Sequence, residues 1–376
     1  MTRQIMKQVL LVTRPLVPPW DEASKNFAYF LGRTITGQSL TLMTTKTSLL
    51  ELPATVHQKV IFSGGHFDLM AKIALLRYLR VSRNLFDITH YLFTPTQYNS
   101  ALLRWFAKPT KGKTLQTIAT LRDDLYSPKA LRAMLFADHL VTYTATAKQK
   151  LERLGFTNVT HIYPGIDLLR YAPKPKDTIL LKQFGFTADH YIVIYPGEYM
   201  RLGATDMLTE AFIDFFTKHP ETDIRFLFAC RVKNEADAQK KKAVYQRFAD
   251  ARLLAYVAFS DTVVDMSALY NSADLIVFPV ENLRGKFDVP LIIIEAYACG
   301  KPVILSDLEQ FREFANDTIC VTIPKNSGTQ LIEKMVYLRD NIQEGVRLGV
   351  NARRFAESSF DLKNTAKQYE AIYTSL

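Results

Sequence analysis

The second half of this 376-residue chain alternates short apolar runs with helical stretches, and this alternation limits the possible folds more than any other feature. The run YIVIY at residues 191–195 is continuous and rich in β-branched side chains, as expected for a parallel strand covered on both faces. Later strand candidates lie at residues 225–229, 254–259, 274–279 and 302–305. This order predicts a doubly wound α/β sheet, in which ligands bind where the carboxyl ends of the strands meet.

The first half repeats the alternation, so two such domains are expected. Its strand candidates lie at residues 9–13, 40–44, 59–62, 88–93, 114–118 and 136–143. The polar segment YAPKPK at residues 171–176 carries two prolines and is interpreted as a linker. We therefore expect a first domain over residues 1–172, a second over residues 177–358, and a C-terminal helix at residues 359–376 that crosses back to the first domain.

Composition argues against several classes of protein. No stretch approaches the roughly 20 uninterrupted apolar residues of a membrane-spanning helix. The cysteines, Cys230, Cys299 and Cys320, form no CxxC pair and are odd in number, which argues against a disulfide framework or a zinc site and fits a reducing cytoplasm. No small-residue cleavage site follows the apolar run at residues 9–13, so this run is interpreted as a first strand and not as a signal peptide.

The net charge of +10 favours anionic partners such as nucleotide phosphates, an anionic lipid surface or nucleic acid. The basic residues form two groups, one of Lys72, Arg77, Arg80 and Arg83, and one of Arg104, Lys108, Lys111 and Lys113 around Trp105 and Phe106. In the first group, apolar residues recur at helical spacing (Leu69, Ile73, Leu76 and Leu79). A basic amphipathic helix can lie on a membrane surface. The alternative is an ordinary surface helix whose apolar stripe packs in the core.

The stretch from Phe287 to Ser306 contains the most specific pattern in the chain. Within it, Glu295 is surrounded by apolar residues, and burying an unpaired carboxylate is costly. Such a glutamate either faces a ligand cleft and accepts hydrogen bonds from sugar hydroxyls, or bonds to a nearby backbone N–H. The run EAYACGKPV at residues 295–303 resembles the signature of the retaining GT-B glycosyltransferases of family 4, the group 1 glycosyl transferases. Three further pieces occur in the family's order: IYPGID at 162–167, LY and AD at 269–274, and FP at 278–279.

This resemblance implies a GT-B fold, in which two doubly wound Rossmann-like domains face a central cleft. It implies transfer of a hexose from a nucleotide diphosphate sugar to an acceptor hydroxyl, with retention at the anomeric carbon. The donor is a substrate, so no permanently bound cofactor is expected. The sequence lacks a DxD-like pair, which fits a reaction that needs no metal. The acceptor would be a carbohydrate or a lipid-linked molecule, and no nucleic acid partner is expected. We expect a cytoplasmic protein, with peripheral attachment to the inner face of the membrane as a further possibility.

In the family, the second glutamate of the signature binds the ribose, and this role carries over to Glu295. The first glutamate would fall on Phe287, which cannot accept hydrogen bonds through its side chain. We therefore hypothesise that the neighbouring Asp288 replaces it and contacts the donor sugar. The alternative is that Asp288 caps the helix that Pro290 opens.

The family also supplies an arginine and a lysine for the diphosphate leaving group. Arg201 is the candidate arginine, in the loop that begins at Gly197, while Gly203 stands near the expected lysine. Arg231, Lys233 and Lys286 are the candidates for the missing charge. The predicted catalytic residues are thus Asp288, Arg201 and Lys233, and the predicted nucleotide contacts are Glu295, Gly197, Arg231 and Lys286. The alternative for Arg231 and Lys233 is a solvated basic loop.

The acceptor site is expected in the first domain. Trp20 and Asn26 follow the first strand, and Trp20 is suited to stack on a sugar ring or an acyl chain. The histidine that many relatives carry after a central strand is absent from TIATLRDD at residues 117–124. His90 lies at another predicted strand end and is the third candidate, with a structural role as its alternative. Two rival functions stay open: a degenerate GT-B protein that binds lipid or nucleotide, and a GT-B nucleotide-sugar epimerase.

Overall fold

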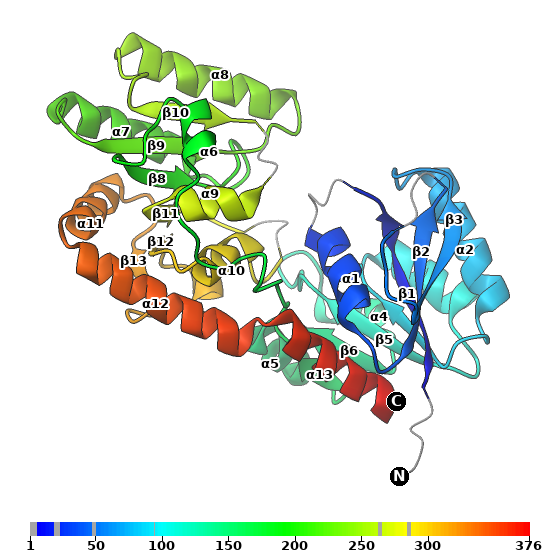
Figure 1. Cartoon of the computed structure of the whole chain (residues 1–376). Coiled ribbons are helices and arrows are strands. Elements are labelled where there is room, and N and C mark those ends of the chain that lie inside the picture. The colour runs from blue at the N-terminus through cyan, green and yellow to red at the C-terminus, as the bar shows by residue number, and fades with distance from the viewer. Residues whose placement is uncertain (1–5, 19–22, 47–49, 94, 262–264, 284–286) are drawn as a thin grey trace. The chain divides into compact units, whose positions relative to one another are not determined.

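The computed structural model describes residues 6–18, 23–46, 50–93, 95–261, 265–283 and 287–376. The chain divides into two compact units, which are coloured along the sequence in Figure 1. Unit 1 comprises Met1–Gly165, Phe287–Val289 and Phe360–Leu376, and unit 2 comprises Ile166–Lys286 and Pro290–Ser359. The short segment Phe287–Val289 therefore belongs with unit 1, although the chain on both sides of it belongs to unit 2.

Unit 1 contains a seven-stranded parallel sheet within the described residues, in the order β3-β2-β1-β4-β5-β6-β7. Its strands are β1 (Gln8–Leu16), β2 (Ser39–Thr45), β3 (Val56–Phe62), β4 (Ile88–Tyr91), β5 (Lys113–Ile118), β6 (His139–Thr142) and β7 (Val159–His161). Its helices are α1 (Ala23–Thr34), α2 (Leu69–Ser82), α3 (Gln97–Leu102), the π-helical turn η1 (Leu103–Ala107), α4 (Pro128–Met134), α5 (Ala145–Arg153) and α13 (Leu362–Ser375). The last helix, α13, packs against α1.

Unit 2 contains a six-stranded parallel sheet within the described residues, in the order β10-β9-β8-β11-β12-β13. Its strands are β8 (Tyr191–Tyr195), β9 (Ile224–Ala229), β10 (Val257–Ser260), β11 (Leu275–Phe278), β12 (Val303–Ser306) and β13 (Val321–Ile323). Its helical elements are α6 (Thr178–Gln183), α7 (Thr205–Lys218), α8 (Glu235–Asp250), α9 (Met266–Ser272), α10 (Leu291–Ala298), η2 (Glu309–Phe311), α11 (Gly328–Asp340) and α12 (Ile342–Ser359).

Both sheets are doubly wound, which confirms the prediction of two Rossmann-like α/β domains. In unit 2 the chain runs outward from β8 to β10, returns to β11 beside β8, and continues outward to β13 on the other side. The strand order therefore reverses between β8 and β11. Loops that leave neighbouring strands diverge at such a point, which makes it the usual ligand site of an open α/β sheet. The apolar runs predicted as strands form the core, and Phe212 of α7 stacks on Phe226 of β9 with ring centres 3.8 Å apart.

Candidate functional site

The loop after β8 holds a buried carboxylate that binds two cations. Glu198 is 6% exposed, and its oxygens accept hydrogen bonds from Nε and Nη2 of Arg201, both at 2.6 Å. The ammonium group of Lys233, from the loop after β9, lies 2.7 Å from Oε1 of the same carboxylate. Charge-assisted bonds of this kind are short and fix the geometry of both partners. The structure thus brings together Arg201 and Lys233, two of the three predicted catalytic residues.

Two glycines let this loop fold tightly. A Cβ atom on Gly197 would overlap the ring of Tyr195, so the backbone passes closer to that ring than any other residue allows. Gly203 has φ +83°, a left-handed conformation that favours glycine, and the Glu281 carboxyl packs against it. These constraints explain why glycine occupies position 203, near the expected lysine. Arg231 lies half-buried two residues after β9.

The two cations keep part of their surface exposed. The side chain of Arg201 is 40% exposed and that of Lys233 is 34% exposed, whereas the Glu198 side chain between them is 7% exposed. Glu198 balances one of the two positive charges, so the three groups together carry a net charge of +1. An anion that approaches the carboxyl ends of β8 and β9 would therefore meet preorganised donors and a favourable potential.

Glu295 lies in α10, where it faces two tyrosines. The hydroxyl of Tyr270 donates a hydrogen bond to Oε2 of Glu295 at 3.1 Å, and Tyr171 forms a second hydrogen bond with the carboxyl group. Burial raises the pKa of Glu295 to about 7, although both hydrogen bonds act in the opposite direction. Within the described part of the chain, Glu295 is thus held by side chains and not by a backbone N–H, and its charge changes near neutral pH.

Asp288 lies in the short segment that belongs to unit 1. Its two carboxylate oxygens accept hydrogen bonds from the backbone N–H of Leu121 at 3.3 and 3.1 Å, and its own N–H donates to the carbonyl of Ala119 at 2.9 Å. Helix α10 has Pro290 at its N-cap and no side-chain cap bond. The alternative prediction that Asp288 caps this helix is therefore wrong. Phe287 packs its ring against Tyr143 with centres 5.6 Å apart, which gives an apolar role to the position of the missing glutamate.

Comparison with known proteins identifies the class of unit 2. Residues 190–341 match the family model described as glycosyl transferases group 1. Over these residues unit 2 is similar to the group 1 glycosyl transferases. The D-inositol 3-phosphate glycosyltransferase of Thermobispora bispora is 25% identical over an alignment 250 residues long, which covers 63% of this chain and 56% of that protein. The protein of the same name from Salinispora arenicola is 26% identical over an alignment 242 residues long, which covers 57% of this chain and 53% of that protein. This chain thus spans about half the length of the curated relatives it matches.

Solved structures identify the fold of the whole chain. HepE from Anabaena, crystallised with UDP, superimposes with a TM-score of 0.74 at 15% identity and covers 99% of this chain and 100% of that one. Sucrose-phosphate synthase from Thermosynechococcus elongatus gives a TM-score of 0.76 at 16% identity, with 99% of both chains covered. These likenesses show that the chain has the GT-B fold, and they confirm the fold that the sequence resemblance implied.

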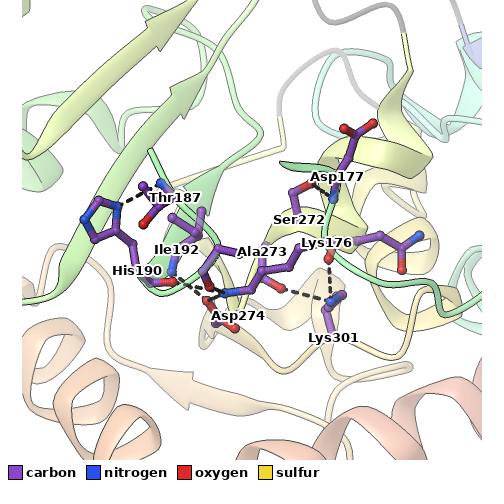
Figure 2. Close-up of polar contacts among 11 residues, drawn as sticks. Lys176, Asp177, Thr187, His190, Ile192, Ser272, Ala273, Asp274 and Lys301 are labelled. Atoms are coloured by element: carbon purple, nitrogen blue, oxygen red, sulfur yellow. Dashed lines mark hydrogen bonds and ion pairs between the residues drawn. The ribbon is translucent and has the colours of Figure 1, made fainter. Parts of the chain in front are cut away.

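The tail of the group 1 signature has a structural role at the opposite edge of the unit 2 sheet. Lys301 donates hydrogen bonds to the carbonyls of Asn271 and Ala273, both at 2.9 Å, at the C-terminal end of α9. Beside it, Lys176 and Asp274 form an ion pair (Figure 2), with Nζ 2.6 Å from Oδ2. Lys301 thus satisfies carbonyls that the end of α9 leaves without intrahelical partners. The lysine of the GKP motif therefore holds the fold between α9 and the amino end of β11.

The acceptor residues predicted for unit 1 have different outcomes. His90 is fully buried in the GT-B fold, with Nδ1 2.7 Å from the hydroxyl of Tyr373 and Nε2 2.7 Å from that of Thr117. Burial lowers its pKa to about 3. The prediction that His90 contacts the acceptor is therefore wrong, because the ring has no exposed surface and both nitrogens are bonded in the core. Asn26 lies half-buried in the first turn of α1. Trp20 and Lys286 lie outside the described residues.

Sequence reasoning missed three residues of the candidate site: Glu198, Tyr171 and Tyr270. Glu198 directly follows the glycine of the β8 loop, and that adjacency is the signal that could have indicated it. Tyr270 belongs to the LY pair that the sequence pattern singled out, but that pair did not indicate a contact with Glu295. Tyr171 stands in the segment interpreted as a linker and gave no comparable signal. Among the described residues, no group of three or more His, Cys, Asp or Glu side chains could hold a metal ion. Within the same residues, no helix is long and apolar enough to cross a membrane.

Proposed function

We propose that the protein is a retaining glycosyltransferase, which moves a hexose from a nucleotide diphosphate sugar to an acceptor hydroxyl. The observation that carries this proposal is the convergence of Arg201 and Lys233 on Glu198, where the strand order of the group 1 domain reverses. The names of the relatives support the reaction class. HepE has also been solved in complex with UDP-glucose, which supports a nucleotide sugar as donor.

In this proposal the donor binds to unit 2. Glu295 accepts hydrogen bonds from the ribose hydroxyls, while Tyr171 and Tyr270 keep its carboxylate oriented. Arg201 and Lys233 stabilise the negative charge that develops on the departing diphosphate, with Gly197, Arg231 and Lys286 as further nucleotide contacts. Fixed cations take the place of a divalent metal, so the reaction is metal-independent.

Asp288 is proposed to position the donor sugar. A carboxylate has about four lone-pair sites, so Asp288 can hold the Leu121 N–H and still accept a sugar hydroxyl. The bond between the anomeric carbon and the phosphate oxygen breaks, and a bond to the acceptor oxygen forms on the same face. The acceptor proton passes to the departing phosphate oxygen, so no covalent enzyme intermediate is needed.

The acceptor is proposed to bind unit 1, where Trp20 and Asn26 follow β1. A carbohydrate or a lipid-linked molecule fits the chemistry of such a loop, because an indole ring can stack on a sugar or cover an acyl chain. We place the reaction in the cytoplasm.

The test is nucleotide release from a panel of UDP, GDP and ADP sugars, with and without candidate acceptors. A transferase releases nucleotide only with an acceptor and forms a product with the anomeric configuration of the donor, which NMR reports. Release without an acceptor would indicate an epimerase. Nucleotide binding with no turnover on any donor would leave a binding protein as the function.

Two variants separate the proposed roles. Glu295→Ala should weaken nucleotide binding in calorimetry, whereas Asp288→Ala should reduce turnover more than nucleotide affinity. Glu344→Ala is the matched control in unit 2, because Glu344 pairs with Arg347 on α12, away from the strand ends. Unchanged nucleotide affinity in Glu295→Ala would contradict the ribose assignment.

A further inference from the structure

Large apolar side chains are exposed on one part of unit 1. Trp105 is 81% exposed and Phe106 is 53% exposed, both in η1. Val81 at the end of α2 is 83% exposed, and Leu85 in the following loop is 71% exposed. Single exposed apolar residues are ordinary on protein surfaces, but several of them on adjoining elements mark an interaction site.

Helix α2 adds further exposed apolar side chains, because only a narrow stripe of it is buried. Its buried residues are Ala71, Leu75, Leu79 and Ser82, a narrow stripe that repeats every three to four residues. Of the apolar residues that the sequence pattern grouped, Leu79 is in the core, whereas Leu69 and Ile73 are 70% and 42% exposed. One face of α2 therefore packs in the core, and a second set of apolar side chains on the helix stays exposed.

The exposed groups lie on elements that adjoin one another. Helix α2 packs against η1, and η1 follows α3 directly. The loop after α2 is tied to the loop after η1, since Asn84 Oδ1 accepts hydrogen bonds from the N–H and the hydroxyl of Thr110 at 3.1 and 3.0 Å. We call the exposed side chains of α2, η1 and these two loops the docking surface.

The docking surface is strongly basic. The sequence from Leu69 to Lys113 contains eight Lys and Arg residues and one acidic residue, Asp87. The Asp87 carboxylate accepts a hydrogen bond from the backbone of Gln8 at 2.8 Å. Within the described part of the chain, no ion pair forms at the basic residues Arg77, Arg80, Arg83, Arg104 and Lys111. Much of the net charge of +10 is thus concentrated beside exposed aromatic and aliphatic groups.

We propose that unit 1 docks through this surface on an anionic membrane. An indole and a phenyl ring insert at the level of the lipid headgroups, while long basic side chains extend to the lipid phosphates. Lipid phosphates complement the excess positive charge, which a neutral apolar partner would leave unmatched. Helix α2 begins after β3 and ends before β4, so the surface runs along the sheet from its carboxyl edge to its amino edge.

The test uses the full chain and vesicle flotation. Vesicles of phosphatidylcholine and phosphatidylglycerol in equal parts should carry the protein, vesicles of phosphatidylcholine alone should not, and added salt should release it. The double variant Trp105→Ala and Phe106→Ala should bind the anionic vesicles about tenfold less. The matched control is Leu169→Ala with Ile179→Ala, which removes two side chains of unit 2 that are 79% and 74% exposed.

A spectroscopic readout places the contact on the surface itself. The chain has two tryptophans, so Trp20→Phe leaves Trp105 as the sole indole. Its fluorescence should shift to shorter wavelength with anionic vesicles and be quenched by brominated lipids. Equal flotation of the wild type and the Trp105/Phe106 variant, or an unshifted spectrum on bound vesicles, would overturn the proposal.

A second copy of the chain is the competing occupant of the docking surface. If the wild type forms dimers in sedimentation experiments without lipid and the Trp105/Phe106 variant does not, a second copy covers the surface and the membrane proposal is wrong. Nucleotide binding should be equal in the wild type and this variant. Membrane docking and the proposed transfer reaction can therefore fail independently.

Discussion

The two edges of the unit 2 sheet use pairs of cations in opposite ways. At the amino edge, the Lys176 ammonium contacts two backbone carbonyls, at 3.1 and 3.0 Å, and the Asp274 carboxylate at 2.6 Å. Lys301 beside it donates to two more carbonyls. At the carboxyl edge, Arg201 and Lys233 share one carboxylate and keep 40% and 34% of their side chains exposed.

The difference between the two pairs of cations indicates that the amino edge of the sheet serves stability and the carboxyl edge serves ligand binding. The Lys176 ammonium has three N–H donors and three acceptors within the protein. All of its hydrogen-bonding capacity therefore stabilises the fold. The exposed cations at the other edge sit where the strand order reverses, the usual position of a ligand. Substitutions at the amino edge should therefore change stability, and those at the carboxyl edge should change binding and turnover.

The largest effect is expected for Arg201→Ala. Because this guanidinium is proposed to stabilise the leaving diphosphate, its loss should lower kcat/KM by about 10²–10³-fold, with little change in Tm. Steady-state kinetics with the active donor, beside a thermal melt, measures both quantities.

The matched control is Arg339→Ala at the amino edge. The Arg339 side chain is also 40% exposed and binds a carboxylate, Asp223, through Nε and Nη2 at 3.1 and 2.7 Å. Its removal should leave kcat/KM unchanged. Equal losses of activity in the two variants would contradict the distinction between the edges.

The next effect is expected for Asp274→Ala. This carboxylate accepts hydrogen bonds from the Ile192 N–H at 2.7 Å and from Lys176, so the change leaves both donors without their acceptor. The free energy of unfolding should fall by about 2 kcal/mol, as measured in urea. Nucleotide affinity of the folded protein should stay at the wild-type value, and a weakened affinity would show that the amino edge also shapes the ligand site.

Glu295→Gln should abolish the pH dependence of nucleotide affinity. The pKa of Glu295 is raised to about 7 by burial, so wild-type nucleotide affinity should rise between pH 6 and pH 8 as the carboxyl loses its proton. The variant should bind about tenfold more weakly at pH 8 and show no such rise. Calorimetry at several pH values tests both, and a parallel rise in the variant would assign the titration to another group.

The same substitution tests how the ionisation of Glu295 is linked to the stability of the fold. The folded pKa lies above the ordinary value of 4.5, so the folded state binds the proton more tightly than the unfolded state. The contribution of Glu295 to stability is therefore present below pH 4.5 and is lost as the pH rises through 7. Glu295→Gln should accordingly raise Tm at pH 8 relative to the wild type, and do so less at pH 5.

Much of the fold could be predicted from the sequence, because buried parallel strands are continuous apolar runs. The three-residue β13 escaped prediction because so short a strand has no periodicity. The predicted strand at residues 254–259 begins later, at Val257, after a turn in which Arg252 has φ 60°. The local sequence therefore determines the existence of a strand better than its boundaries.

The site was less predictable, since its contacts depend on the fold. Arg201 and Lys233 could be placed together because each follows a neighbouring strand. The inward direction of Glu198 and the approach of two tyrosines to Glu295 depend on packing that no motif shows. His90 is the clearest failure. Its partner Tyr373 is 283 residues away in the sequence, so the pattern at the strand end could not show that the ring is buried.

The smallest effect is expected for Glu198→Gln, which changes nucleotide affinity through the carboxyl edge alone. Glu198→Gln keeps the shape of the side chain but removes the negative charge between Arg201 and Lys233. The local charge rises by one unit, so the nucleotide should bind about threefold more tightly at low salt, and the gain should shrink as salt is added. Turnover should fall in the same variant, because the two cations lose the carboxylate that fixes their positions. Weaker nucleotide binding would show instead that Glu198 contributes more by positioning these cations than it costs by neutralising one of them.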